Sequence, residues 1–187
     1  MIKEKIISKI KILPKNSLEK LLALFEPVAF KKGDLIIKEN SFPDSIYFIE
    51  KGLARGFANY LDSEITFWLG HEGEPILGMK TLVNNQKCYE NIEALEDIIG
   101  YKISFKVLSE LYNNDIHIAN WGRKFAEIEL LKTEERLLAR QVKTATERYY
   151  DLCALHPQLI KRVPLGYIAS YLGITQVSLS RIRAEIK

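Results

Sequence analysis

The last two dozen residues carry side chains that suit contacts with DNA. Arg181 can donate two hydrogen bonds to O6 and N7 of a guanine, which discriminates between bases by about 1–3 kcal/mol. Gln176 can bind an adenine or a phosphate. Three further side chains suit phosphate oxygens, which fix position and not sequence: Thr175, Ser178 and Arg183. A helix over this segment turns five side chains toward a partner or solvent: Gln176, Val177, Ser180, Arg181 and Lys187.

The positive charge of the chain is concentrated in the same region. The 187 residues include 27 Lys and Arg against 24 Asp and Glu, a formal charge of +3. Residues 136–187 hold nine basic and three acidic residues, a net charge of +6, which leaves −3 for residues 1–135. A basic end on a mildly acidic body favours a polyanionic partner. A solvated helix surface would give the same charge, so a motif must decide between the two.

Two short helices must position these side chains. Pro164 can start the first helix, Gly173 suits the left-handed residue that ends it, and Thr175 can cap the second. The inward faces of both helices are apolar and consist of Leu165, Ile168, Ala169, Leu172, Leu179 and Ile182. This pattern predicts a helix-turn-helix, whose second helix enters the major groove by its N-terminal end. The alternative is a helical hairpin whose outer face is exposed to solvent and binds no partner.

A long helix is predicted ahead of this pair, from about Asp115 to Gln141. Its apolar residues lie mostly three or four positions apart and include Ile118, Trp121, Phe125, Ile128, Leu131 and Leu138. Such a stripe must pack against another surface. It can cover the chain's own sheet, or it can pair with the same helix of a second chain through Trp121, Phe125 and Ile128. The spacing alone does not choose between these interpretations. We expect the second, in which the crossing of two long helices sets the distance between the paired C-terminal helices.

The middle of the chain has the pattern of a β-domain. Short strands, separated by Gly, Pro, Asn and Asp, are predicted at Leu35–Lys38, Ile46–Glu50, Leu53–Tyr60, Ile65–Leu69, Tyr89–Leu95 and Ile98–Ile103. Many short strands without intervening helices favour an antiparallel sandwich or jelly roll. Helices are predicted at residues 2–25, with a break at Pro14 and a cap at Ser17, at 105–112 after Ser104, and at 145–155.

Over nearly its whole length the sequence resembles the Crp/Fnr family of transcription regulators. The similarity is carried by FKKGDLIIKEN, SIYFIEKGLARGF, EITFW, NIEALED and the C-terminal YIASYLGIT…LSRIR. It implies an α+β fold in three parts. Residues 1–114 would form a cyclic-nucleotide-binding-like antiparallel β jelly roll with N-terminal helices. Residues 115–141 would be a long dimerisation helix, and residues 142–187 a helix-turn-helix DNA-binding domain.

The resemblance also implies partners. Members of this family are homodimers that bind a two-fold symmetric DNA site and recruit or block RNA polymerase. By this resemblance Gln176, Val177 and Arg181 occupy the three base-reading positions. Family members often carry Glu at the middle one, and Val177 cannot accept a hydrogen bond from cytosine N4, so the DNA sequence read there should differ. The alternative is a small-molecule sensor that acts through protein contacts and keeps a vestigial DNA-binding domain.

The ligand-binding residues of the family are only partly matched. In nucleotide-binding relatives a short helix after a Gly-Glu motif, followed by an Arg, holds the cyclic phosphate. If Gly78 matches that glycine, Met79 replaces the ribose-binding Glu, and Cys88 or Tyr89 takes the place of the Arg. Lys80 and Lys87 are candidate substitutes, with surface lysines as the alternative interpretation. A buried phosphate without a bidentate cation loses its strongest contact, so cyclic AMP is not the expected ligand and the effector is left open.

Other chemistries lack their residues. Cys88 and Cys153 are too few for an iron–sulfur cluster, and His71, His117 and His156 share no metal-ligand spacing, so no metal, cofactor or catalytic residue is predicted. No apolar run approaches the roughly 18–20 residues that span a bilayer. The first 13 residues alternate Lys with Ile and so lack the continuous apolar segment of a secretory signal peptide. The expectation is a cytoplasmic DNA-binding regulator without a membrane partner.

Overall fold

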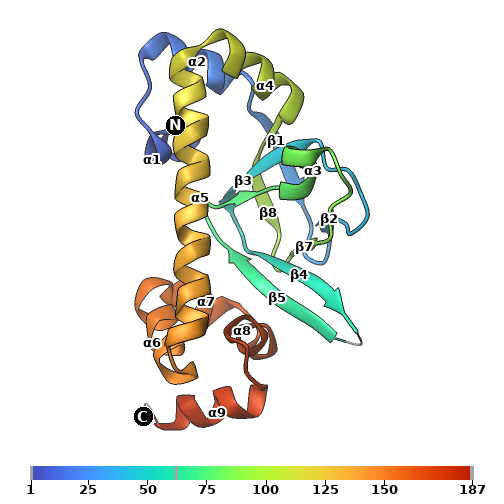
Figure 1. The fold of residues 1–187 in the computed structure, drawn as a ribbon, viewed down its shortest axis with the longest axis vertical. Coiled ribbons are helices and arrows are strands. Elements are labelled where there is room, and N and C mark those ends of the chain that lie inside the picture. The colour runs from blue at the N-terminus through green and yellow to red at the C-terminus, as the bar shows by residue number, and fades with distance from the viewer. Residues whose placement is uncertain (1, 62, 186–187) are drawn as a thin grey trace.

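The computed structural model describes residues 2–61 and 63–185. Its strands are β1 Glu26–Phe30, β2 Leu35–Ile37, β3 Ser45–Lys51, β4 Ala54–Tyr60, β5 Ser63–Gly70, β6 Pro75–Ile76, β7 Asn91–Ala94 and β8 Ile98–Ser104. Its helices are α1 Ile2–Ile10, α2 Lys15–Ala23, α3 Met79–Asn84, α4 Phe105–Asn114, α5 Ile116–Val142, α6 Ala145–Leu155, α7 Pro157–Arg162, α8 Leu165–Leu172 and α9 Gln176–Glu185. The long helix α5 runs beside the sheets, from the N-terminal helices to the C-terminal ones (Figure 1).

Strands β1–β8, the β-sandwich, form two four-stranded antiparallel sheets. One sheet has the order β1-β8-β3-β6 and the other β2-β7-β4-β5. The sandwich interior is apolar and includes Ile37, Ile49, Ile76, Ile92 and Ile98. The antiparallel sandwich predicted from the strand spacing is therefore confirmed, and it does not close into a barrel. Strands β1 and β6 were not predicted, because β1 contains Pro27 and β6 has only two residues.

The first half of α5 packs inside the chain. Trp121 is 0% and Phe125 is 6% exposed, and both lie in one apolar core with Ile7 of α1 and Phe48 of β3. The indole Nε1 of Trp121 donates to the backbone oxygen of Ile7 at 3.0 Å. Because these side chains are already covered within one chain, the prediction that Trp121 and Phe125 face a second chain was wrong. Ile128, one turn beyond, is half-buried.

Asp115 fixes the beginning of α5. Its carboxylate accepts from the backbone N–H groups of His117 at 3.1 Å and Ile118 at 3.3 Å, which confirms the predicted cap. The predicted cap at Ser17 was wrong, because α2 begins earlier, at Lys15. Instead the buried Ser17 hydroxyl donates to the Asp115 carboxylate at 3.0 Å. The N-terminal helices are thereby attached to the start of the long helix.

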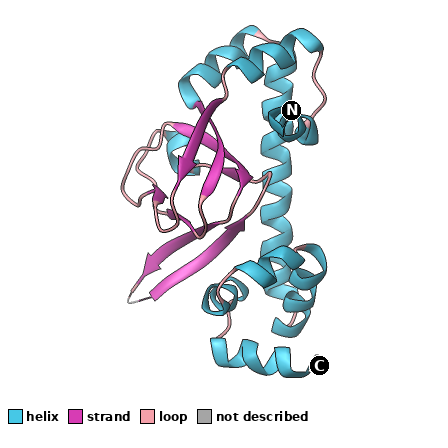
Figure 2. Ribbon diagram, turned by 180° about the vertical axis from the view of Figure 1, so that it is seen from behind, coloured by secondary structure: helices cyan, strands magenta, loops and turns pink. Residues whose placement is uncertain are grey.

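Helices α6–α9, the C-terminal helices, gather at the far end of α5. Viewed from behind, they lie below the sandwich and beside the end of the long helix (Figure 2). Their core includes Leu152, Leu159, Ile168 and Leu179, and it continues into the sandwich through Leu53, Leu69 and Leu95. The C-terminal helices therefore share a core with the β-sandwich. Among the residues described, no helix combines the length and apolarity needed to cross a membrane.

Candidate nucleic-acid interface

Helices α8 and α9 are joined by a sharp turn. Gly173 has φ +71°, the left-handed conformation predicted for it, and its N–H donates to the Ser170 carbonyl at 3.0 Å. The N–H of Ile174 donates to the Ala169 carbonyl, also at 3.0 Å. The end of α8 thus has carbonyl groups satisfied by the turn, and residues 173–175 are enough to connect it to α9.

Thr175 begins the next helix. Its Oγ1 accepts from the backbone N–H of Ser178 at 3.1 Å and lies 2.9 Å from the Ser178 hydroxyl, which confirms the predicted cap. Leu179 is 0% and Ile182 is 8% exposed, so the inward face of α9 is buried as predicted. Helix α9 is therefore fixed in orientation by its apolar side.

The opposite face of α9 points to solvent. Four side chains of the predicted interface are exposed there, with Val177 62% exposed: Gln176, Val177, Ser180 and Arg181. Arg183 and Thr175 are exposed as well, whereas Ser178 is half-buried. Within residues 2–61 and 63–185, no salt bridge occupies Arg181 or Arg183. Lys187, also predicted to face a partner, lies outside the described residues.

Helix α8 is hydrogen-bonded to the edge of the β-sandwich. The Ser170 hydroxyl accepts from the backbone N–H of Thr66 in β5 at 2.9 Å. The guanidinium of Arg55, itself 1% exposed, lies 3.8 Å from the ring centroid of Tyr167. Arg55 also pairs with Glu64 at 2.8 Å. Arg55 can be buried at this junction because Glu64 compensates its charge and its guanidinium stacks on the ring of Tyr167.

A second polar junction joins α7 to the sandwich. Arg162 binds Glu72 at 2.9 Å and Glu96 at 2.6 Å. The hydrogen bonds that Arg162 donates to the carboxylates of Glu96 and Glu72 raise its pKa. Although desolvation by burial raises the pKa of Glu72, the hydrogen bonds from Arg162 and from backbone N–H groups lower it to about 2. This ion-pair group therefore stays charged at neutral pH.

None of these junction residues was found from the sequence. Arg55 and Tyr167 are 112 positions apart, and no spacing rule connects residues on separate elements. Tyr167 and Ser170 of α8 fall between its predicted inward positions, which is a weak sign that this helix makes a second contact. The junctions matter because they set the position of α9 relative to the sandwich.

The proposed ligand residues of the sandwich do not converge. Gly78 precedes α3 and is buried against Pro43, and Cys88 is 1% exposed. The Cys88 thiol donates to the Lys38 carbonyl at 3.1 Å. The three remaining candidates are exposed: Met79, Lys80 and Tyr89. The structure therefore brings Gly78 and Cys88 together and turns the others outward, with no guanidinium at the Cys88 position.

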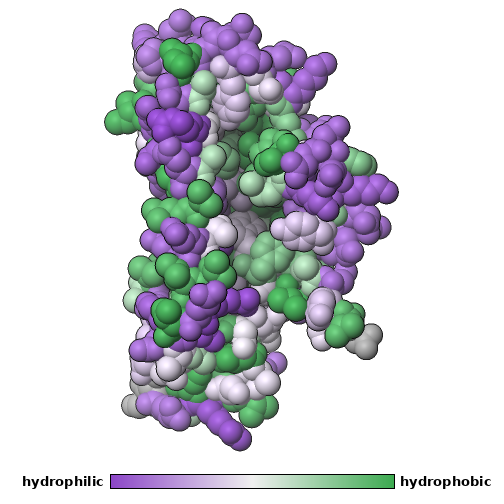
Figure 3. All heavy atoms as spheres, viewed as in Figure 1, coloured by the Kyte–Doolittle hydropathy of each residue, from purple (hydrophilic) through white to green (hydrophobic). Residues whose placement is uncertain are grey.

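The second half of α5 exposes leucines that were not predicted to form an interface. Leu130 is 71%, Leu131 54%, Leu137 56% and Leu138 50% exposed. Hydrophobic and hydrophilic residues alternate along the side of the molecule where α5 lies in Figure 1 (Figure 3). The repeat of a leucine pair after seven residues was the available signal, because such a repeat marks one side of a helix. These four residues are the leucine face.

The comparisons with known proteins agree with this architecture. Residues 27–115 match the family described as the cyclic nucleotide-binding domain. The sequence has no significant match among curated proteins.

Three solved structures share the fold. The c-di-GMP responsive global regulator CLP of Xanthomonas campestris is 14% identical, with a TM-score of 0.71 over 92% of this chain and 91% of that one. FixK2 from Bradyrhizobium japonicum is 19% identical, with a TM-score of 0.71 over 87% and 84% of the two chains. The Thermus thermophilus catabolite activator protein is 18% identical, with a TM-score of 0.59 over 95% and 85%. Residues 27–115 thus resemble the cyclic nucleotide-binding domain in sequence, and the chain shares the fold of these three solved proteins.

Proposed function

We propose that the protein is a sequence-specific DNA-binding transcription regulator, in which α8 and α9 act as a helix-turn-helix. One observation carries the proposal: α9 buries Leu179 and Ile182 while it exposes Gln176, Val177 and Arg181 on a single free face. A helix held from behind by apolar contacts can enter a major groove without rearranging. The net charge of +6 on residues 136–187 attracts the phosphate backbone.

The roles of the exposed side chains follow from their chemistry. Arg181 binds a guanine edge through two N–H groups, and Gln176 binds an adenine edge or a phosphate. Val177 contacts a thymine methyl group, since it has no hydrogen-bonding atom in its side chain. The other polar and basic residues bind phosphate oxygens and orient the helix: Thr175, Ser178, Ser180, Arg183 and Lys187.

The regulator acts as a homodimer through the leucine face of α5. Four leucines are exposed on one half of a 27-residue helix, and a second copy of the same helix is the partner that fits them best. Ile128, at the edge of this surface and half-buried, completes the contact. Pairing of two α5 helices sets the distance between two α9 helices, so the DNA site is a palindrome with half-sites about one helical turn apart.

The β-sandwich acts as a sensor whose ligand is not cyclic AMP. Two positions could supply a guanidinium to the phosphate: Cys88, whose thiol is buried and hydrogen-bonded to a backbone carbonyl, and Tyr89, which is exposed. A buried anion there would have no bidentate partner. The bound dimer recruits or blocks RNA polymerase, as in the family it resembles.

In vitro selection of duplexes from a random pool tests the function. The expected result is one enriched palindrome, whose affinity falls steeply with salt because each phosphate contact releases counterions. Enrichment of no sequence at several salt concentrations would overturn specific DNA binding. It would favour the second candidate, a sensor that acts through protein contacts.

A further inference from the structure

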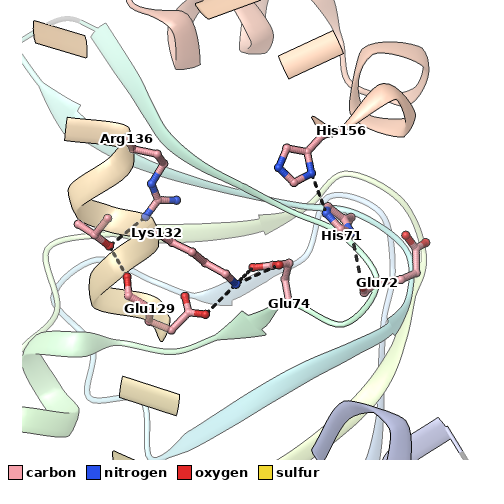
Figure 4. Close-up of polar contacts among 8 residues, drawn as sticks. His71, Glu72, Glu74, Glu129, Lys132, Arg136 and His156 are labelled. Carbon is pink, nitrogen blue, oxygen red and sulfur yellow. Dashed lines mark hydrogen bonds and ion pairs between the residues drawn. The ribbon is translucent and has the colours of Figure 1, made fainter. Parts of the chain in front are cut away.

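Two histidines meet where the C-terminal helices contact the β-sandwich. His71 follows β5, and His156 joins α6 to α7. Nε2 of His71 lies 3.3 Å from Nδ1 of His156, and Nδ1 of His71 lies 3.2 Å from the carbonyl oxygen of Glu72 (Figure 4). The two rings are 5.3 Å apart between centroids, and both side chains are half-buried. The contact thus links segments that are 85 positions apart in the sequence.

The number of protons on the pair decides whether the contact is attractive. When both rings are neutral, Nδ1–H of His71 donates to Glu72 and Nδ1–H of His156 donates to Nε2 of His71. One added proton keeps a donor facing an acceptor, since the charged ring donates to the neutral one. A second added proton places two N–H groups and two positive charges face to face at 3.3 Å. The hydrogen bond is then lost and repulsion replaces it.

Charged groups lie on the elements packed around the pair. They are Glu72 and Glu74 in the loop after β5, Glu96 between β7 and β8, Glu129, Lys132 and Arg136 of α5, and Arg162 of α7. Figure 4 shows Lys132 between Glu74, at 3.1 Å, and Glu129, at 2.9 Å. Desolvation and the neighbouring His71 and Lys132 lower the pKa of His156, and Glu74 opposes this. Glu72, whose pKa is lowered to about 2, is therefore ionised at the pH where the second proton binds.

We propose that His71 and His156 form a proton-sensitive latch that holds the C-terminal helices in one position against the β-sandwich. The second protonation loosens the latch, and α9 then samples several positions relative to α5. The consequence for DNA rests on the proposed function: only the dimers whose two α9 helices match the half-site spacing bind, so the apparent affinity falls with their fraction.

Distance distributions between two spin labels test the latch without DNA. Labels carried by non-canonical amino acids replace Lys51 of β3 and Lys161 of α7, two exposed residues on either side of the junction. The protein is free of affinity tags, and every buffer contains EDTA so that no metal ion bridges the rings. The expected distribution is narrow at pH 7.5 and broad at pH 5.5.

The three histidines of the chain supply matched controls. The double variant His71→Gln/His156→Gln should give the same distribution at both pH values, and His156→Arg should give a broad one already at pH 7.5. His117→Gln, an exposed position at the start of α5, should behave as the parent does. An unchanged parent distribution between pH 7.5 and 5.5, or an equal change in the double variant, would overturn the latch.

Affinity for the selected duplex forms a separate arm. In the parent we expect a loss of about fivefold or more between pH 7.5 and 5.5, which the double variant lacks. If no variant binds any duplex at either pH, the proposed function fails, while the distance distributions still decide on the latch. If the distributions respond and the affinity of the parent is constant, the latch does not control DNA binding and that consequence is wrong.

Discussion

The hydroxyl of Ser170 in α8 accepts a hydrogen bond at 2.9 Å from the backbone N–H of Thr66 in β5. Residues 104 positions apart thus join the helix that precedes α9 to an edge strand of the sandwich. Together with the stacking of Arg55 on Tyr167, this bond sets where the exposed face of α9 lies. Under the proposed function, a signal that reaches the sandwich would alter DNA binding by changing such contacts or the proposed pairing of α5.

Replacing Arg181 should remove base discrimination. Arg181→Ala is expected to lose about 1–3 kcal/mol of preference for guanine at one position of each half-site, because the alanine cannot donate to O6 and N7. The measurement is the affinity for the selected duplex and for a duplex changed at that base pair. Arg183→Ala is the matched control and should weaken both duplexes equally. An Arg181→Ala protein that keeps the preference would show that another residue reads this base.

Replacing Val177 should change the preferred base. Val177→Glu introduces an acceptor for cytosine N4, so selection with this variant should enrich cytosine at one position of each half-site. Ala184→Glu, also exposed but nearer the end of α9, should leave the selected sequence unchanged. An identical selected sequence for the parent and Val177→Glu would place this residue away from the bases.

The leucine face should control association. Leu130→Glu/Leu137→Glu places two charges on it, and we expect the dimer to dissociate because the carboxylates would have to be desolvated. Sedimentation velocity at micromolar concentration measures the change. Ile12→Glu, an 82% exposed apolar residue outside α5, is the control. A dimer that survives the double substitution would locate the interface elsewhere.

Trp121 should matter for stability and not for association. Trp121→Ala is expected to cost about 3–5 kcal/mol of unfolding free energy, because it empties a fully buried site and removes the hydrogen bond to Ile7. Denaturant unfolding at fixed protein concentration measures it, with Leu155→Ala, at a 72% exposed position outside α5, as a control. A fall in dimer affinity with unchanged stability would restore Trp121 to the interface.

The junction at Glu72 should give an acid-sensitive contribution to stability. The folded-state pKa of Glu72 is about 2 against an ordinary 4.5, so its contribution is present above pH 4.5 and is lost as the pH falls toward 2. In Glu72→Gln the free energy of unfolding should therefore change less over this range, whereas the exposed Glu135→Gln should follow the parent. Equal slopes for Glu72→Gln and the parent would contradict the assignment.

Local signals in the sequence predicted the parts of the fold that local chemistry controls. Asp115, Gly173 and Thr175 each act on backbone groups within three residues, so their roles could be read from position alone. The face of Trp121 could not, because periodicity shows that a stripe is buried but not what covers it. The N-terminal helices cover it here.

The candidate site likewise has features that local spacing predicted and features that it could not predict. The inward and outward sides of α9 followed from its spacing, and the structure agrees for the residues it describes. The junctions of Arg55, Arg162 and His156 depend on pairings between distant elements, for which a single sequence carries no pattern. The convergence of ligand residues in the sandwich also depends on side-chain direction, and Met79 and Tyr89 turned outward.

The ratio of affinities for the selected palindrome and for a scrambled duplex of equal composition tests the central claim most directly. It should be measured at two salt concentrations in the same buffer. The account predicts a ratio of about 1,000 or more at physiological salt, with both affinities falling as salt rises. A ratio near one at both salt concentrations would contradict it, because a basic surface alone binds every duplex equally.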